Sequence, residues 1–434
     1  MAIDKLTVLL IGNGGREHAL SWKLAQSPHV EHIYVVPGNG GTELLQNVTN
    51  ISNISQEDFP ALASFAKEKK VNFLIPGPEA PLVAGITDFF QQNVPGIRVF
   101  GPSKAAARME GSKTFSKDFM KEYNIPTAAY ENFSDFEAAK RYLDAIDHDV
   151  VIKADGLAAG KGVIIPQTKE EAHAALKDIM LTREFGDAGN SVVIEEFLEG
   201  EECSILTFSD GHVIASLPPA QDHKRIGDGD TGPNTGGMGT YAPCPDRVIS
   251  KSQLEHINKT ILQPTIDGMR KSGYTFVGCL FTGLMMTPNK GAKVLEYNVR
   301  FGDPETQSVL PLLSTDLAEL MYHCTTATLS SVLPIQISSQ SAATVVVAAG
   351  GYPGTYAKGT PITLDAVAQD TTTIFHAGTV VKDGKLLTSG GRVIAATATG
   401  ADLAEAVKRA YEGVKSIHFN GMQFRSDIAA KGLK

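Results

Sequence analysis

The segment from Leu6 to Ala25 restricts the fold of this chain more than any other. Residues Leu6–Ile11 are continuously apolar apart from Thr7, as expected for a strand of a parallel sheet that is covered on both faces. A glycine-containing run, Gly12–His18, follows, and apolar residues with helical spacing begin at Ala19. A strand, a tight turn and a helix in this order predict a parallel α/β unit at the start of the chain.

The turn of this unit is typical of an anion-binding site, because free N–H groups and the positive end of a helix dipole meet there. It is not a dinucleotide fingerprint, since Glu17 stands where the third glycine is needed. The next expected strand, His32–Val36, does not end at an acidic residue that would hold a ribose. We therefore do not expect a nicotinamide cofactor, and a tight turn without a ligand is the alternative interpretation.

The composition restricts the partners and the compartment. A chain of 434 residues is long enough for two to four domains, and a net charge of −9 argues against nucleic acid or a membrane surface as a partner. The four cysteines lack metal-ligand spacing, no apolar run reaches transmembrane length, and the first strand begins too early to leave room for a signal peptide. We expect a cytoplasmic protein with reduced thiols.

A second buried strand, Val71–Pro76, ends at a Gly-Pro-Glu turn. Ligands of open α/β sheets bind beyond the carboxyl ends of the strands, so Glu79 is placed to accept hydrogen bonds from ribose hydroxyls. The alternative is that Glu79 only complements the dipole of the helix that it begins. Val99 and the residues after it close a first α/β domain.

Lys153 is a candidate for binding phosphate groups, whereas Lys113, taken alone, is more typical of a solvated surface residue. Lys113 lies at the start of a helix, where a positive charge is unfavourable without a negative partner. Lys153 lies on a strand that leads into a loop rich in glycine and alanine, and a second strand, Val163–Pro166, returns. Because strand returns to strand, this is not a Walker loop, and we expect a hairpin that folds over phosphates. The alternative is a flexible hairpin with surface lysines.

Two polar segments follow. The strand Ser191–Glu196 leads into an acidic turn that, taken alone, is more typical of solvated surface. Residues Gln221–Gly239 form a long polar segment that we interpret as a loop, and loops of this length are usually functional. Within it, Asp222 is a candidate partner for a substrate ammonium, and the amides of Thr235–Gly239 for a reacting carboxyl group. His223 is either a general base or a structural residue.

The segment Val294–Gln307, with the sequence VLEYNVRFGDPETQ, carries the chemistry. It begins as a strand, where alternate residues share a face, so Glu296, Asn298 and Arg300 point the same way. Glu296 and Asn298 offer hard oxygen ligands that suit Mg²⁺ together with nucleotide phosphates. Arg300 offers a fork of donors for a carboxylate or a transferring phosphoryl group. A solvated polar face is the alternative.

A serine-rich connection, Ser330–Ser341, is the best candidate for a domain boundary. Short strands, glycine turns and a helix from Asp402 to about Ser416 follow it. Lys358 and Arg392 lie beside glycine turns of this smaller domain, where they either face a substrate phosphate or are ordinary surface charges.

The run RFGDPETQ at Arg300–Gln307 resembles the signature of the phosphoribosylamine–glycine ligase family, whose members are ATP-grasp enzymes of purine biosynthesis. The resemblance continues in the expected order from Ile11 to Arg392, and so covers nearly the whole chain. It implies ATP-dependent ligation of glycine to 5-phosphoribosylamine, with Mg²⁺ or Mn²⁺ as the metal. The fold that it implies is a mixed α/β multidomain structure: a Rossmann-like domain at 1–110, an ATP-grasp domain at 111–328 with a mobile lid at about 124–195, and a small C-terminal α+β domain at 334–434.

The resemblance also implies roles for particular residues. Glu296 and Asn298 hold the metal, and Arg300, Lys153 and Asp222 are catalytic. In the acidic turn, Glu195 accepts from the adenine amine, the backbone of Phe197 and Leu198 reads the ring edge, and Glu202 holds the ribose. The expected ATP contacts are Lys113, Lys153, Gly156, Gly160, Lys161, Gly162, Glu195, Glu196, Phe197, Leu198 and Glu202. The expected substrate contacts are Gly14, Gly15, Arg16, Glu79, Asp222, Asn234, Gly236, Gly237, Arg300, Lys358 and Arg392.

Three other functions compete with this one. A formate-using or carboxylating ATP-grasp ligase does not explain the RFGDPETQ run. A nucleotide-binding regulatory protein does not need the clamp for a transferring phosphate. A nicotinamide-dependent oxidoreductase rests on Gly12–Gly15 alone. Because the chain ends after one C-terminal domain, we expect a monofunctional enzyme that is a monomer or weak dimer and has only small-molecule partners.

Overall fold

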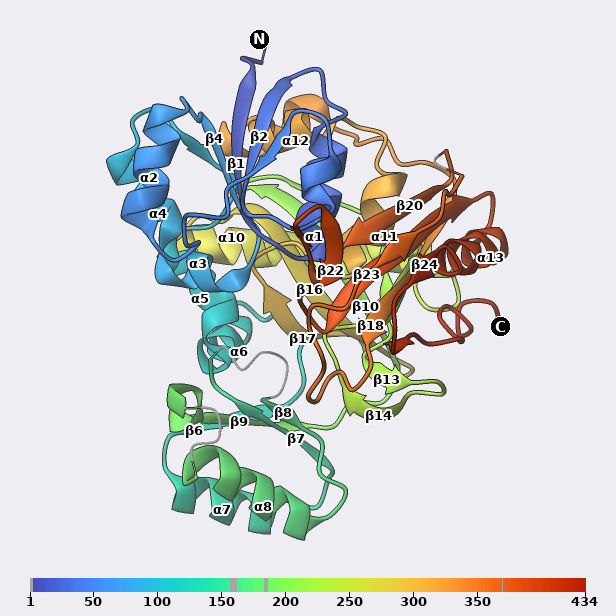
Figure 1. Ribbon diagram of the computed structural model, residues 1–434. Helices are drawn as coiled ribbons and strands as arrows, with labels where there is room; N and C mark the ends of the chain where they lie inside the picture. Colours follow the sequence, from blue (N-terminus) through green and yellow to red (C-terminus); the bar gives the residue numbers. More distant parts are fainter. Residues whose placement is uncertain (1–2, 157–161, 183–185, 369) are drawn as a thin grey trace.

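The computed structural model describes residues 3–156, 162–182, 186–368 and 370–434. Figure 1 shows an N-terminal region in blue, a small lid in green that projects away from the rest, and a C-terminal region in orange and red. Within the described ranges, no helix is long and apolar enough to cross a membrane.

The N-terminal region is a five-stranded sheet with the order β3-β2-β1-β4-β5, and all its strands run parallel. This confirms the expected parallel α/β unit, in which an apolar first strand is followed by a glycine turn and a helix. The strands are β1 Leu6–Gly12, β2 Val30–Pro37, β3 Val48–Asn50, β4 Phe73–Pro76 and β5 Arg98–Val99. The helices are α1 Gly15–Leu24, α2 Phe59–Glu68, α3 Glu79–Ala84, α4 Ile86–Asn93 and α5 Lys104–Gly111.

The lid is a four-stranded sheet with the order β6-β9-β7-β8 and two helices, and it projects from the body below α6 (Figure 1). The expected hairpin is present, since Lys153 on β7 pairs with Val163 on β8. Of the loop that joins these strands, residues 157–161 lie outside the described residues. The elements are α6 Lys113–Glu122, β6 Tyr130–Phe133, α7 Phe136–Ala145, β7 Val150–Ala154, β8 Val163–Ile164, α8 Lys169–Met180 and β9 Val192–Glu196.

The central sheet has the order β11-β10-β16-β17, and its edge strand β17 carries the chemical motif. The register of β17 against β16 shifts between Val294 and Glu296, and the strand ends at Asn298. The elements are β10 Glu201–Asp210, β11 Ile214–Ser216, α9 Lys251–Ile257, α10 Gln263–Lys271, β16 Val277–Thr287, β17 Gly291–Asn298, α11 Glu305–Val309 and α12 Leu317–Thr325.

The interpretation of Gln221–Gly239 as a loop without secondary structure is wrong. Short strands lie within it, and β15, which begins at its end, pairs with β18 of the C-terminal region. This pairing brings residues about a hundred positions apart onto one sheet, which local sequence patterns do not reveal. The strands concerned are β12 Gln221–Asp222, β13 Arg225–Gly227, β14 Thr231–Asn234 and β15 Gly239–Ala242.

The C-terminal sheet has the order β12-β15-β18-β23-β20, with β25 paired to β18, and α13 packs on it. Two further two-stranded sheets pair β19 with β24 and β21 with β22. The elements are β18 Ser341–Ala349, β19 Thr363–Leu364, β20 Thr372–His376, β21 Thr379–Lys382, β22 Lys385–Thr388, β23 Arg392–Gly400, α13 Leu403–Val414, β24 Ile417–His418 and β25 Met422–Gln423.

The core is continuous between the N-terminal and central sheets, so both hold the active-site strands in place. One buried cluster contains Leu9 of β1, Met109 of α5 and Val294 of β17, whereas the lid has a separate core around Ile152. A lid with its own core that joins the body through few elements is suited to move as a unit.

Candidate active site

The exposed face of β17 and the residues directly after it present three polar side chains. Glu296, Asn298 and Arg300 are each half-buried and alternate with the buried Tyr297 and Val299. This alternation confirms the expected shared face, although Arg300 lies beyond the strand.

The carboxylate of Glu296 lies in a positive field. Burial alone raises the pKa of Glu296, but Lys224, Lys153, Lys113 and Arg300 outweigh that effect and lower it, so the group is anionic at neutral pH. The side-chain amide nitrogen of Asn298 donates to Tyr297 O at 3.1 Å, which leaves its carbonyl oxygen as the exposed ligand atom. A carboxylate and an amide oxygen on one face fit a hard divalent cation that takes further ligands from phosphates. Among the described residues no group of three or more acidic, histidine or cysteine side chains forms another such site.

Lysines from two other elements converge on this face. Lys153 Nζ donates to Leu295 O of β17 at 3.0 Å and lies 2.8 Å from Glu195 Oε1 of β9. Lys113 Nζ donates to Gly156 O at 2.7 Å, so the start of α6 contacts the glycine loop of the lid. Burial lowers the pKa of Lys113, and the carboxylates of Glu296 and Asp155 act against this effect. Asp155 also accepts from Thr114 N at 3.2 Å. Gly162 is buried at the start of the returning strand, while Gly160 and Lys161 lie outside the described residues.

The expected adenine-binding turn is held by one ion pair and by hydrogen bonds. Glu196 accepts from Ala129 N at 3.1 Å and from Lys290 Nζ at 3.0 Å. The amide of Phe197 donates to Asp149 O at 2.9 Å, so this N–H is already used. The Phe197 ring is 39% exposed, whereas Leu198 is buried against Ala128 and Met285. These contacts favour hydrogen bonding of the adenine edge by the backbone of Leu198 rather than by the N–H of Phe197. The role of this backbone in adenine binding stays a prediction.

Arg300 is held between two carboxylates in this structure. Its Nε lies 3.0 Å from Glu79 Oε2 and its Nη2 lies 3.0 Å from Glu110 Oε1. Glu79 therefore does more than complement the dipole of α3, because it faces the motif. Burial and repulsion by Glu79 raise the pKa of Glu110, although Arg300 lowers it in part. The anchoring of the glycine carboxylate by Arg300 stays a prediction. It requires that the glycine carboxylate replace Glu79 or Glu110 as a partner of Arg300.

The glycine turn before α1 already holds carboxylates of the chain itself. Gly14 N donates to Glu17 Oε2 at 2.6 Å, and Arg16 N donates to Asp303 Oδ2 at 3.0 Å. Glu17 also fills the space beside Gly12, where a Cβ on the glycine would lie 2.6 Å from Glu17 Cδ. Two of the N–H groups that we expected to bind an anion, those of Gly14 and Arg16, therefore donate to carboxylates of the chain itself.

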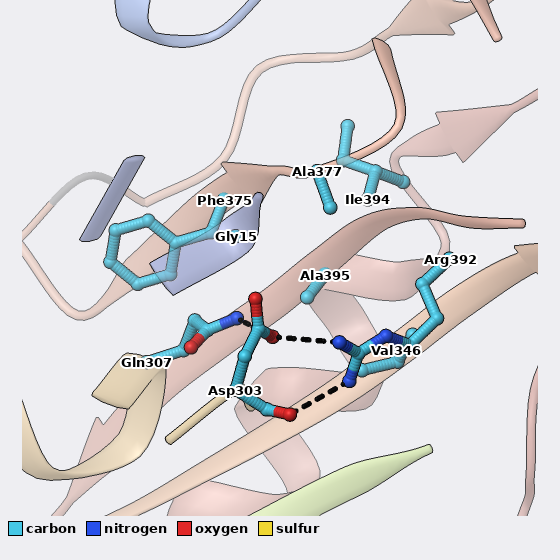
Figure 2. A pocket seen from close by; sticks show the side chains of 9 residues that line it. All are labelled: Gly15, Asp303, Gln307, Val346, Phe375, Ala377, Arg392, Ile394 and Ala395. Atoms are coloured by element: carbon cyan, nitrogen blue, oxygen red, sulfur yellow. Dashed lines mark hydrogen bonds and ion pairs between the residues drawn. The ribbon is translucent and has the colours of Figure 1, made fainter. Parts of the chain in front are cut away.

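Arg392, Asp303 and Gln307 line a cavity of about 10 Å³ next to Gly15 (Figure 2), which is about the space one water molecule needs. Arg392 Nη1 donates to Gly236 O at 2.6 Å and to Asp303 O at 2.9 Å, and Nη2 lies 3.4 Å from Asp303 Oδ1. Arg392 thus ties three segments together and is not ordinary surface charge. Lys358, in contrast, is exposed, and its Nζ lies 6.0 Å from the centre of the Tyr356 ring.

Asp222 and His223 have different environments. Burial raises the pKa of Asp222, and the nearby Glu305 carboxylate raises it further. Of the two interpretations of His223, the geometry favours the structural one, since Nδ1 lies 3.0 Å from Gly239 O and Nε2 accepts from Ala429 N at 3.1 Å. Both ring nitrogens are therefore used. Asn234 ends the exposed strand β14.

Sequence reasoning missed Lys117, Glu110 and Lys224. Lys117 lies four residues after Lys113 on α6, so its position on the same helix face was readable from the spacing. Glu110 contacts Arg300, which is 190 positions away, and Lys224, between β12 and β13, donates to Glu202 Oε2 of β10 at 3.1 Å. No local pattern gives these last two contacts.

Comparison with known proteins identifies the family. Three family models match: the N domain of phosphoribosylglycinamide synthetase at residues 6–110, its ATP-grasp (A) domain at 111–306 and its C domain at 342–431. A bifunctional purine biosynthetic protein of Pichia angusta is 60% identical over 433 residues, which are 100% of this chain and 54% of that protein. The phosphoribosylamine–glycine ligase of Vibrio cholerae is 47% identical over 99% of both chains.

A solved structure agrees with these relatives. The crystal structure of phosphoribosylamine–glycine ligase from Thermotoga maritima is 35% identical, with a TM-score of 0.84 over 98% of this chain and 100% of that one. The chain spans about half the length of the bifunctional relatives that it matches and nearly all of the ligase from Vibrio cholerae. The chain belongs to the phosphoribosylglycinamide synthetase family.

Proposed function

We propose that the chain catalyses the ATP-dependent ligation of glycine to 5-phosphoribosylamine, giving glycinamide ribonucleotide, ADP and phosphate. The observation that carries this proposal is that two side chains with oxygen ligands, two lysines and one arginine lie close together. Glu296 and Asn298 on β17, Lys113 on α6, Lys153 on β7 and Arg300 lie together, from elements that are far apart in the sequence. This set is suited to phosphoryl transfer, and family membership supports the choice of substrates.

The reaction has two steps. A carboxylate oxygen of glycine attacks the γ-phosphorus of ATP, the bond from that phosphorus to the β–γ bridging oxygen breaks, and ADP leaves. The amine nitrogen of the phosphoribosylamine then attacks the acyl carbon of glycyl phosphate, the bond from that carbon to the phosphate oxygen breaks as the C–N bond forms, and the proton lost by the amine leaves with the departing phosphate. Catalysis of both steps is mainly positioning and charge neutralisation.

Each residue of the site has a role in this scheme. Lys113 and Lys153 neutralise the ATP phosphates, Arg300 holds the glycine carboxylate and then the acyl phosphate, and Asp222 holds the glycine ammonium. An ammonium beside Asp222 supplies the positive charge that this buried carboxyl, with its raised pKa, needs in order to ionise.

Glu296 and Asn298 fit a divalent cation, for which we propose Mg²⁺ or Mn²⁺. When bound, such a cation neutralises charge on the β- and γ-phosphates. The lid residues 124–195 exclude water during turnover, since glycyl phosphate would otherwise hydrolyse. On the adenine side, we propose contacts by Glu195, Glu196, the backbone of Leu198, and Glu202.

The phosphoribosylamine would bind between the N-terminal and C-terminal sheets. Gly14–Arg16 and Glu79 face it from the N-terminal side, and Asn234, Gly236, Gly237, Lys358 and Arg392 from the other. We also propose the domain boundaries 1–110, 111–328 and 334–434, and a cytoplasmic enzyme. Buried free cysteines at Cys203, Cys244, Cys279 and Cys324 are compatible with a reducing compartment.

The test is ADP release with glycine and freshly generated phosphoribosylamine, each omitted in turn. ADP formation that needs both substrates and falls at least about a hundredfold in Glu296→Gln supports the proposal. Glu255→Gln on the exposed face of α9 is the matched control and retains the wild-type rate. ADP formation with formate or bicarbonate in place of glycine would instead identify a related ligase. ATP binding without stimulated turnover would identify a nucleotide-binding module.

A further inference from the structure

Lys117 is a buried charged residue next to the ATP lysines that the mechanism above does not use. It lies on α6, is 2% exposed, and has its Nζ 3.0 Å from Glu195 Oε2 of the lid strand β9. It also donates to Thr127 Oγ1 at 2.7 Å, and Thr127 Oγ1 in turn donates to Val294 O of β17 at 2.6 Å. Lys117 therefore connects the lid to β17, the strand that carries the metal-binding pair.

Glu195 is shared between two lysines. Its Oε1 lies 2.8 Å from Lys153 Nζ, an ion pair without hydrogen-bond alignment, while Oε2 faces Lys117. The side chains of Glu195 and Lys117 are 2% and 3% exposed, and that of Lys153 is 10% exposed. Two cations and one carboxylate leave a surplus positive charge, which is costly to bury unless an anion balances it.

We propose that Lys117 is a positioning residue for nucleotide binding, which neutralises Glu195 and so leaves the charge of Lys153 available to the ATP phosphates. The proposal rests on the proposed function in one respect, that ATP binds here with its phosphates beside Lys153. Of the two lysines, Lys153 is the more exposed and also faces Glu296, whereas Lys117 is enclosed by protein. The surplus charge is thus presented on the side of the metal pair.

Without Lys117, Lys153, whose Nζ lies 2.8 Å from Glu195 Oε1, is the one cation among the described residues that remains within ion-pair distance of the Glu195 carboxylate, in a site of low dielectric. A phosphate would then have to compete with a buried ion pair for the same ammonium. The predicted loss is specific to phosphate, because the proposed function assigns Lys153 to the phosphates and not to adenine or ribose.

The test measures binding of MgATP and of adenosine by calorimetry to wild type, Lys117→Met, and Lys117→Met combined with Glu195→Gln. We expect the dissociation constant for MgATP to rise at least about tenfold in Lys117→Met, the lower end of the value of a charge-assisted hydrogen bond, with that for adenosine unchanged. The double variant removes both members of the pair and should regain most of the preference for MgATP over adenosine, a ratio that does not depend on the proposed contact between Glu195 and adenine, since both ligands share it. Lys121→Met on the exposed side of the same helix is the matched control.

A purely structural role of Lys117 gives a different pattern. It predicts that MgATP and adenosine weaken together and that the second substitution worsens the defect, and either result would overturn the proposal. Retention of the full preference for MgATP over adenosine in Lys117→Met would overturn it as well. If wild type itself shows no preference for MgATP over adenosine, the proposed function fails instead, so the two failures are distinguishable.

A pH series adds a second readout. Burial lowers the pKa of Lys117 to about 8, against the raising effect of Glu195, so the preference for MgATP should fall as the pH rises through about 8. The charged or titratable groups that face Lys117 are Glu195 and Glu196 on β9, Lys153 on β7 and Tyr130 on β6, whose own pKa is raised by burial and by Asp118. The decline should be absent in Lys117→Met.

Discussion

Removal of the Glu110 carboxylate is expected to destabilise the protein through unpaired buried donors. Glu110 Oε2 accepts from Val299 N at 2.7 Å, Oε1 lies 3.0 Å from Arg300 Nη2, and the side chain is 4% exposed. Glu110→Ala therefore leaves two buried donors without an acceptor, one of them charged, which corresponds to about 3–5 kcal/mol. That is a large share of the stability of an ordinary domain.

Glu110→Gln separates the loss of hydrogen bonds from the loss of charge. The amide oxygen of glutamine can accept from only one of the two donors, so we expect a cost of about 1–3 kcal/mol, less than for alanine. Burial raises the pKa of Glu110 and so disfavours its charged form. Loss of the charge alone should therefore add little to the decrease in the free energy of unfolding. Catalysis should fall in both variants, because Arg300 loses one of its two carboxylate partners.

The assay is urea denaturation followed by circular dichroism and by fluorescence of Trp22, the only tryptophan of the chain. Glu122→Ala, at an exposed position on α6, is the control and should lie within about 0.5 kcal/mol of wild type. A Glu110→Ala variant within about 1 kcal/mol of wild type, or one equal to Glu110→Gln, would refute the count of unpaired donors.

Three further predictions concern the metal, the histidines and the cysteines. Glu296→Gln should lose binding of Mn²⁺ in the presence of a non-hydrolysable ATP analogue, measured by electron paramagnetic resonance, whereas Glu255→Gln should keep it. Burial lowers the pKa of His376 to about 4. As the pH falls from about 6.5 through about 4, the imidazole binds a proton in the unfolded state but not in the folded state. The free energy of unfolding should therefore decrease by roughly 1 kcal/mol per pH unit over this range. Thermal melts of His376→Gln should show a flatter pH dependence over this range, and those of His256→Gln the wild-type one. All four cysteines are buried, and burial raises the pKa of Cys203 to about 12, so native protein should react with a thiol reagent far more slowly than unfolded protein, and equal rates would contradict the packing.

The features that sequence predicted well depend on neighbours in the chain. Alternation along Val294–Arg300 gave the shared face of Glu296 and Asn298, and the apolar run at Leu6–Ile11 gave the parallel strand. The hairpin with Lys153 followed from strand, glycine loop and strand. Each of these patterns is set by backbone geometry within a few residues.

The features that sequence did not predict depend on contacts between distant segments. Asp303 accepts from Arg16 N across 287 positions and occupies the turn that we expected to bind an anion. β15 pairs with β18, so the expected loop at Gln221–Gly239 forms an edge of the C-terminal sheet. Glu110 and Arg300 meet across the boundary between two expected domains. Such pairings follow from the packing of whole layers and have no local signal.

Transfer of oxygen from glycine to phosphate is the most decisive observable for the proposed reaction, and glycine labelled with ¹⁸O in its carboxylate reports it. With ATP and 5-phosphoribosylamine, we expect one ¹⁸O atom per turnover in inorganic phosphate, because the attacking carboxylate oxygen leaves with the phosphoryl group. Mass spectrometry of the released phosphate would show this label. Unlabelled phosphate formed together with glycinamide ribonucleotide would contradict the glycyl phosphate intermediate, and with it the proposed roles of Arg300 and the metal pair.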